Sequence, residues 1–242
     1  LDQTKSEALE WESVKSKQGV GCMWQDHILE PIEERKIRIG YLSADYCNHP
    51  VARFMLPIFK NHNRETFEIW ALSCGSHSDW ITKHIQSESD HWLDLRFPND
   101  IQAARLISDL RLDVLIELGG FTGDNRLGIL VHKPAPIQLS YLGYPAPTYL
   151  KCIDGWIGDK ELFGGLRELE SNAHKLINIP KGYMAFDSGG DITIEKRCTA
   201  ANFRYGCFNH ARKLTNKTID LFCKVIRQSP GSELVLKSIS FH

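Results

Sequence analysis

The sequence has no excess of charge of either sign. Its 242 residues include 29 lysines and arginines against 30 aspartates and glutamates, which gives a net charge of -1. Without a basic excess, binding to nucleic acid is not indicated. Uninterrupted apolar runs are also short, and none approaches the roughly 18 residues that a membrane-spanning helix needs. No signal peptide is recognisable. We therefore expect a globular cytoplasmic protein that binds no nucleic acid and has no membrane span.

Several motifs of known chemistry are missing as well. The seven cysteines are scattered and include no C-x-x-C pair, which argues against a disulfide framework and against a structural zinc site. Neither a G-x-G-x-x-G fingerprint nor a Walker loop is present, so no dinucleotide site or P-loop is supported. A D-x-D pair and a G-x-S-x-G nucleophile elbow are also absent. We expect no metal site and no cofactor.

From residue 36 onward, strand-like and helix-like segments alternate. Strands are predicted at 36–43, 67–73, 91–95, 112–118, 137–142, 152–158 and 175–179, and helices at 50–61, 78–88, 100–111 and near 125–131. This alternation predicts right-handed crossovers and a mostly parallel sheet with helices on both faces, which is a doubly wound α/β domain. Pro50 suits the first turn of its helix, and Ser78 is the expected cap of the next.

The two ends of the chain differ from this central pattern. Residues 3–17 predict a polar helix with a sparse apolar stripe of Ala8, Leu9, Trp11 and Val14. A polar, glycine-containing stretch at 181–201 breaks the alternation, which then restarts with a strand, a helix and a strand. We therefore expect four parts: a leading segment at 1–35, a Rossmann-like domain at 36–182, a linker at 183–202, and the truncated start of a second domain at 203–242.

Ligands of open parallel sheets bind beyond the carboxyl ends of the strands, so the loops that follow strands are the places to search. His49 directly precedes a helix and is a candidate general base, or else a packed loop residue behind an Asn48 cap. The glycine-rich loop 119–123 permits close backbone approach to a ligand, or is a tight turn. Loop 142–147 presents backbone groups to a sugar or base, or is a bare loop.

A fourth loop, at 208–215, carries two cations just before a helix. Arg212 and Lys213 beside a helix N-terminus suit a phosphate or pyrophosphate, although the loop also fits an exposed basic segment. His91 begins a strand and points either into a cleft or into the core.

Taken together, these loops resemble the catalytic region of the O-linked N-acetylglucosamine (O-GlcNAc) transferase family. The matching text is RIGYLSADYCNHPVARFM, FEIWALS, SDHWLDL, DVLIELGGFTGDNR, KPAPIQLSYLGYPA and YGCFNHARKLTNKTIDLFCKVIRQSPGSELVLKS. It covers roughly residues 36–240, in the family's order. The resemblance implies a GT-B fold, in which two Rossmann-like domains face each other across a cleft. This chain would hold the N-terminal one and the start of its partner.

The resemblance also implies roles for individual residues. His49 falls on the histidine of the family's N-H-P motif, a proposed base, and Lys213 falls on the lysine that contacts the diphosphate. Further expected contacts to the nucleotide sugar are Asn209, His210, Leu142, Gly143, Tyr144, Pro145, His91 and Thr122. Two places depart from relatives: residues 146–149, on the donor-sugar side, and Arg53, on the acceptor side.

The reaction implied by the resemblance is transfer of a sugar from a UDP-sugar donor to a protein Ser or Thr hydroxyl. The expected donor is UDP-N-acetylglucosamine, the transfer inverts the anomeric carbon, and it needs no metal. Tetratricopeptide repeats are expected upstream, and the 242 residues alone are expected to be inactive. Open alternatives are a glycan, small-molecule or asparagine acceptor, a non-catalytic interaction module, and a nicotinamide-dependent enzyme.

Overall fold

The computed structural model describes residues 2–17, 22–23, 31–164, 175–187, 193 and 202–238. The chain divides into two compact units, residues 1–190 and 191–242, and each is described by itself. The division falls inside the linker predicted at 183–202.

A parallel sheet forms the framework of the first unit. Its seven strands are β1 (Ile37–Ser43), β2 (Phe67–Ser73), β3 (His91–Asp94), β4 (Val114–Glu117), β5 (Ile137–Tyr141), β6 (Gly155–Gly158) and β7 (Lys175–Asn178). They lie in the order β3-β2-β1-β4-β5-β6-β7, and every neighbouring pair is parallel. The predicted doubly wound α/β fold is thus confirmed. Because the chain runs outward from β1 to β3 and then returns to β4, the strand order reverses between β1 and β4.

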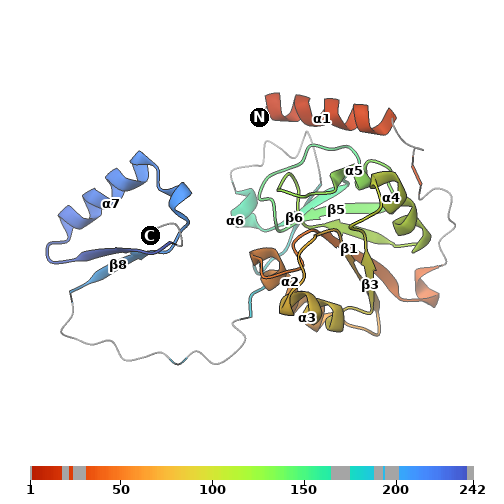
Figure 1. Cartoon of the computed structure of the whole chain (residues 1–242), viewed down its shortest axis with the longest axis horizontal. Coiled ribbons are helices and arrows are strands. Elements are labelled where there is room, and N and C mark those ends of the chain that lie inside the picture. The colour runs from red at the N-terminus through yellow and green to blue at the C-terminus, as the bar shows by residue number, and fades with distance from the viewer. Residues whose placement is uncertain are drawn as a thin grey trace. The chain divides into compact units, whose positions relative to one another are not determined.

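Helices cover both faces of this sheet, as Figure 1 shows. They are α2 (Pro50–Asn61), α3 (Trp80–Glu88), α4 (Asp100–Asp109), α5 (Leu127–Leu130) and α6 (Lys160–Phe163), and a short 3-10 turn, η2 (Ile32–Glu34), precedes β1. Successive residues of a strand point to opposite faces. Tyr41 accordingly packs with Phe59 of α2 and Ile81 of α3, whereas Leu42 packs with Ile107 of α4 on the other side.

The helices predicted from the sequence begin within two residues of their expected starts, but two caps differ. The helix predicted at 50–61 is confirmed, with Pro50 in its first turn. Its cap is His49, not Asn48, because the imidazole accepts a bond from the backbone N–H of Val51. The next helix begins at Trp80 and is capped by Asp79, so the expectation of a Ser78 cap is wrong. A carboxylate accepts helix N–H bonds more strongly than a hydroxyl, which favours Asp79.

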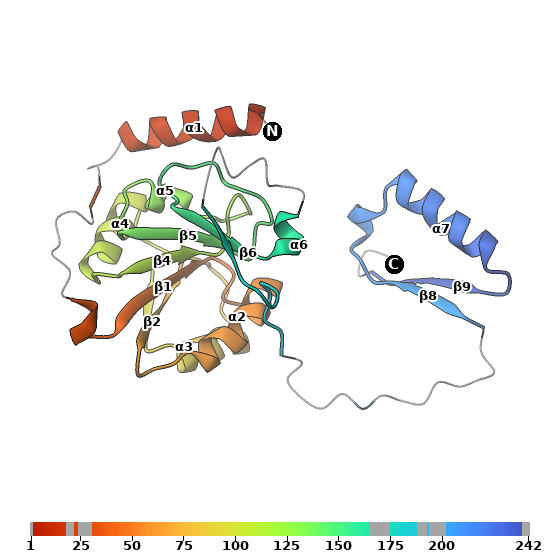
Figure 2. The same cartoon turned by 180° about the vertical axis from the view of Figure 1, so that it is seen from behind.

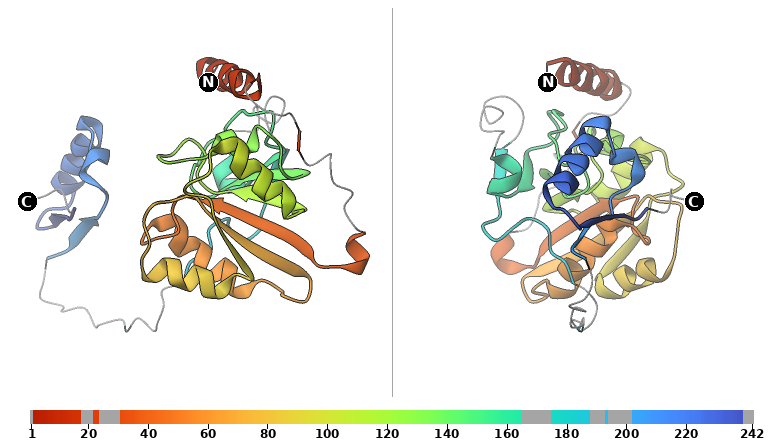
Figure 3. Two further views of the ribbon diagram at one scale, coloured as in Figure 1. Left: turned by 45° about the vertical axis from the view of Figure 1, so that its right-hand side comes forward. Right: turned by 90° about the vertical axis from the view of Figure 1, so that its left-hand side faces the viewer.

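An N-terminal helix, α1 (Asp2–Lys17), lies on the α4 and α5 side of the sheet in Figures 1, 2 and 3. Ala8 is buried and Trp11 packs against the same apolar cluster. Val14, however, is 51% exposed, so the predicted apolar stripe is wrong at that position. Glu12 occupies the buried face instead and is only 8% exposed.

The second unit is a small β-α-β arrangement. Strands β8 (Arg204–Cys207) and β9 (Glu233–Leu236) pair in parallel. The 3-10 turn η4 (Ala211–Lys213) and helix α7 (Asn216–Gln228) connect them, as Figure 2 shows. The predicted strand-helix-strand order at 203–238 is confirmed.

Candidate active site

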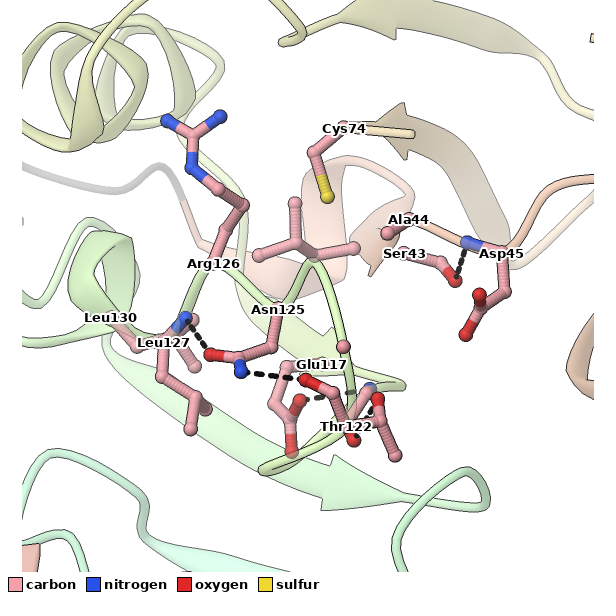
Figure 4. A pocket seen from close by; sticks show the side chains of 13 residues that line it. Ser43, Ala44, Asp45, Cys74, Glu117, Thr122, Asn125, Arg126, Leu127 and Leu130 are labelled. Carbon is pink, nitrogen blue, oxygen red and sulfur yellow. Dashed lines mark hydrogen bonds between the residues drawn. The ribbon is translucent and has the colours of Figure 1, made fainter. Parts of the chain in front are cut away.

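The loops after β1 and β4 meet where the strand order reverses. At such a point, neighbouring crossovers run to opposite faces and leave a crevice at the carboxyl edge of the sheet. A pocket lies there, lined by Leu42–Asp45 at the end of β1, Cys74 after β2, and residues between Glu117 and Leu130 from the end of β4 onward. Figure 4 shows Ser43 and Asp45 on one side of this pocket and Glu117, Thr122 and Asn125 on another.

His49 stands beside this edge as the N-cap of α2. Its Nδ1 accepts a hydrogen bond from the Val51 N–H at 3.3 Å and lies 3.6 Å from Oδ2 of Asp45. Burial raises the pKa of Asp45, an effect that the nearby His49 partly offsets. The His49 side chain is 44% exposed, so the imidazole remains accessible from solvent.

The loop that carries His49 is held by a hydrogen bond to the cap of the neighbouring helix, α3. Asp79, the cap of α3, also accepts the backbone N–H of Asn48 at 2.5 Å. The Asn48 amide oxygen in turn accepts from the Arg53 guanidinium at 2.8 Å. Capping interactions of α2 and α3 therefore hold the backbone on which His49 stands.

The glycine-rich turn after β4 is organised by a buried carboxylate. Glu117 accepts the N–H groups of Gly119 at 3.0 Å and Gly120 at 2.7 Å, and Ser140 donates its hydroxyl to the same carboxylate. Burial, which outweighs these bonds, raises the pKa of Glu117. Thr122 closes the turn by donating its hydroxyl to the Gly119 carbonyl at 2.7 Å.

The loop after β5 packs directly on this turn. Gly143 donates its N–H to the Leu118 carbonyl at 3.1 Å. Gly120 has a positive φ of +52°, and a Cβ at that position would lie only 2.3 Å from Cβ of Tyr144. The rings of Phe121 and Tyr144 meet edge to face with centroids 5.7 Å apart. The structure thus brings Leu142, Gly143, Tyr144 and Pro145 together with Thr122.

His91 lies elsewhere. It is the first residue of β3, three residues before the carboxyl end of that strand. Its Nε2 lies 2.7 Å from Oε1 of Glu68, and its ring stacks on Trp70 with centroids 4.0 Å apart. The structure does not bring His91 together with the loops at the crevice, and its role as a ligand-binding residue stays a prediction.

In the second unit, the predicted anion loop follows β8. His210 caps η4 by accepting the Arg212 N–H on Nδ1 at 3.2 Å, and Thr215 caps the 13-residue helix α7. The side chain of Lys213 is exposed between these two caps, as is that of Asn209 next to β8. A lysine beside the amino end of a long helix is a suitable anion-binding arrangement.

Comparison with known proteins now identifies the family. The model of the family described as "Glycosyl transferase family 41" matches residues 18–191, which include the loops after β1, β4 and β5. The chain belongs to glycosyl transferase family 41. The match covers His49, the glycine-rich turn and the Tyr144 loop, and it ends before Lys213.

Individual relatives agree with the family 41 assignment. A protein of Arabidopsis thaliana named "Probable UDP-N-acetylglucosamine--peptide N-acetylglucosaminyltransferase SEC" is 32% identical over 215 residues, which are 84% of this chain and 22% of that protein. A rice protein (Oryza sativa subsp. japonica) with the same enzyme name and the designation SPINDLY is 27% identical over 87% of this chain and 23% of its own. This family 41 chain thus spans about a fifth of the length of the curated relatives it matches.

A solved structure also matches. It is a mutant of the O-GlcNAc transferase of Thermobaculum terrenum, with a TM-score of 0.76 and 28% sequence identity. The match covers 84% of this chain and 38% of that one. The resemblance of this family 41 chain to O-GlcNAc transferases is confirmed.

Among the residues that the structure describes, no group of three or more His, Cys, Asp and Glu side chains is placed to hold a metal ion. Within the same residues, no helix of this family 41 chain is long and apolar enough to cross a membrane.

Sequence reasoning missed one residue of the crevice, Glu117. Its only signal in the sequence is a single acidic residue that ends an otherwise apolar strand, Val114–Glu117. Because the side chain is 3% exposed, its charge is not a solvated surface charge, and it orders the turn of this family 41 site.

Proposed function

We propose that this chain supplies part of the catalytic region of a glycosyltransferase that moves N-acetylglucosamine from UDP-N-acetylglucosamine to a protein Ser or Thr hydroxyl. The acceptor attacks the anomeric carbon in line, so that its configuration inverts. UDP leaves, and the hydroxyl proton passes to a base.

One observation carries this proposal. The loops that family 41 membership covers converge at the carboxyl edge of the sheet between β1 and β4, the place where a doubly wound sheet binds ligands. The relatives are named for UDP-N-acetylglucosamine and peptide, which supports the donor and acceptor classes.

The contacts of His49 determine which of its ring nitrogens must carry the proton if it is to act as the base. While Nδ1 accepts the Val51 N–H, the neutral ring carries its proton on Nε2, which is then a donor. A base at Nε2 requires the proton on Nδ1 instead, where Oδ2 of Asp45 at 3.6 Å is the available acceptor after a small ring rotation. We therefore assign Asp45 the task of orienting the imidazole.

Lys213 would stabilise the diphosphate as negative charge builds on it. The lysine and the amino end of α7 supply positive charge that a metal ion supplies in other transferases, so the proposed reaction is metal-independent. Asn209 and His210, in the same loop, are the proposed neighbours of the nucleotide.

The decisive experiment uses the full-length gene product and a variant of this lysine. Lys213→Ala is expected to lower turnover about 100-fold to 1000-fold, because it removes charge stabilisation from the transition state. The matched control is Lys224→Ala, which removes the same charge from an exposed position farther along α7. Equal turnover in the two variants would remove Lys213 from the mechanism.

Assays with peptide and glycan acceptors and several UDP-sugars test the substrate classes. Absence of UDP binding in the intact protein would instead favour a non-catalytic interaction module. Upstream tetratricopeptide repeats and a cytoplasmic location stay predictions.

A further inference from the structure

The connection between β5 and β6 differs from its neighbours in the sheet. Residues 142–154 contain no helix, whereas the crossovers from β1 to β5 each contain one. A parallel crossover must return from the carboxyl edge to the amino edge of the sheet, and its backbone groups then lack intrahelical partners. The first part of this connection, residues 142–147, is the Tyr144 loop, which we take as part of the donor site because the resemblance to O-GlcNAc transferases implies contacts there to the nucleotide sugar.

Helix α1 lies where the crossover helix is missing. Ala8 and Trp11 of α1 share an apolar cluster with Tyr149, Leu150 and Ile153 of the crossover. The two segments lie far apart in the sequence and side by side in the fold, on the side of α4 and α5 (Figures 2 and 3).

A single carboxylate of α1 satisfies the backbone of the crossover. Glu12 is four positions after Ala8, so the two side chains share a face of the helix, and both are buried. Its Oε2 accepts the N–H of Lys151 at 2.9 Å, and its Oε1 accepts the N–H of Cys152 at 2.8 Å. These two bonds cap a tight turn that is closed by the Ile153 N–H on the Leu150 carbonyl.

The other end of the crossover rests on the glycine-rich turn. Gly143 bonds to the carbonyl of Leu118, and Tyr144 packs against Gly120. The backbone between these contacts and Glu12 is largely buried, with Thr148 and Leu150 both 0% exposed. A close-packed segment of this kind transmits a displacement at one end to the other.

We propose that Glu12 is a positioning residue for the donor site: by capping the 150–153 turn, it holds the Tyr144 loop against the glycine-rich turn. The catalytic consequence of this inference rests on the proposed function. The coupling between α1 and the Tyr144 loop does not depend on it. α1 is then a structural part of the donor site.

The test compares Glu12→Gln with Glu10→Gln, which makes the same charge change at an exposed position of the same helix. In Glu12→Gln, the amide oxygen can still accept one of the two backbone N–H groups of Lys151 and Cys152. The amide NH2 then faces the other N–H, and two donors cannot form a hydrogen bond. Hydrogen exchange of the backbone amides at 143–152, apart from Pro145 and Pro147, which carry no N–H, is expected to become about 10-fold to 100-fold faster in Glu12→Gln, with β1 and β2 unchanged. Unchanged exchange at 143–152 would overturn the proposal.

A second measurement needs no substitution. In the unsubstituted protein, the backbone amides of Lys151 and Cys152 are expected to be protected from hydrogen exchange to the same degree as the central amides of α1. The reason is that a single undocking of α1 from the 150–153 turn exposes both sets of amides. Unprotected amides at these two positions would also overturn the proposal.

Kinetic measurements distinguish a positioning role of Glu12 from a simple loss of stability. In the full-length gene product, Glu12→Gln is expected to raise the KM for UDP-N-acetylglucosamine about fivefold or more, with kcat within about twofold, and Glu10→Gln to change neither. Faster exchange with an unchanged KM would refute the positioning role. If the unsubstituted protein transfers no sugar, the proposed function fails, and exchange alone decides the coupling.

Discussion

The contact between Gly120 and Tyr144 makes a sharp prediction for the variant Gly120→Ala. Gly120 has a φ of +52°, a conformation that costs an L-residue roughly 1 kcal/mol or more. The new Cβ would also lie 2.3 Å from Cβ of Tyr144, so the two loops must separate by about 1 Å to restore ordinary contact.

The two costs add, because one is local to the backbone and the other lies between loops. Overpacking of this size costs about 1–3 kcal/mol, so the variant should lose about 2–4 kcal/mol of unfolding free energy. For a unit of this size, that corresponds to a fall in Tm of roughly 5–15 °C.

Tryptophan fluorescence during urea or thermal unfolding measures this directly, because all six tryptophans precede residue 191 and report on the first unit. The matched control is Gly123→Ala in the same turn, where an added Cβ meets nothing within 4 Å. The control should be neutral, or stabilising by up to about 1 kcal/mol through the unfolded state. Equal stability of the two variants would refute the packing argument.

Two other predictions concern the same unit. Arg35 forms two bonds, of 2.6 and 2.7 Å, to the buried carboxylate of Asp113, so Arg35→Met should cost about 2–4 kcal/mol in urea unfolding. Arg96→Met, which breaks an exposed pair, should have little effect, and equal losses would contradict the burial argument. Burial lowers the pKa of His132 and of His62 below the ordinary 6.5, so the unfolded chain takes up protons first as the pH falls. The stabilisation that comes from neutral His132 and His62 should be fully present above pH 6.5 and decline below it. Tm measured from pH 7.5 to 5 should therefore fall less in His132→Gln than in the unsubstituted protein.

Local patterns predicted the elements of the first unit well. The helix at Pro50–Asn61 combines a first-turn proline with an amphipathic stripe, and its bounds agree with the structure. The order of the strands in the sheet is a different matter, because β1 and β4 pair although more than 70 residues separate them. No periodicity within a segment carries that information, so the crevice could be placed only on the edge of the sheet, not between two named strands.

Parts of the candidate site were predictable from the sequence where a loop contains a residue of unusual chemistry. They were not predictable where a carboxylate accepts hydrogen bonds from backbone N–H groups. His49 and the glycine-rich turn stand out in the sequence; the turn lines the crevice, and His49 lies beside Asp45, which also lines it. Glu12 looks like an ordinary surface charge in the sequence, and Glu117 is marked only as an acidic residue at the end of an apolar strand. Their partners are N–H groups, which every residue except proline carries, so nothing in the sequence marks the pairing.

The contact between Glu12 and Lys151 also has a consequence for synthesis on the ribosome. These residues are 139 positions apart, and at about 5–20 residues per second the intervening chain takes roughly 7–28 s to make. The segment made early therefore waits, with Trp11 uncovered, until the crossover has emerged. Its docking is a late event, and a translational pause before residue 151 would lengthen the time during which this apolar surface is open to chaperones or to aggregation.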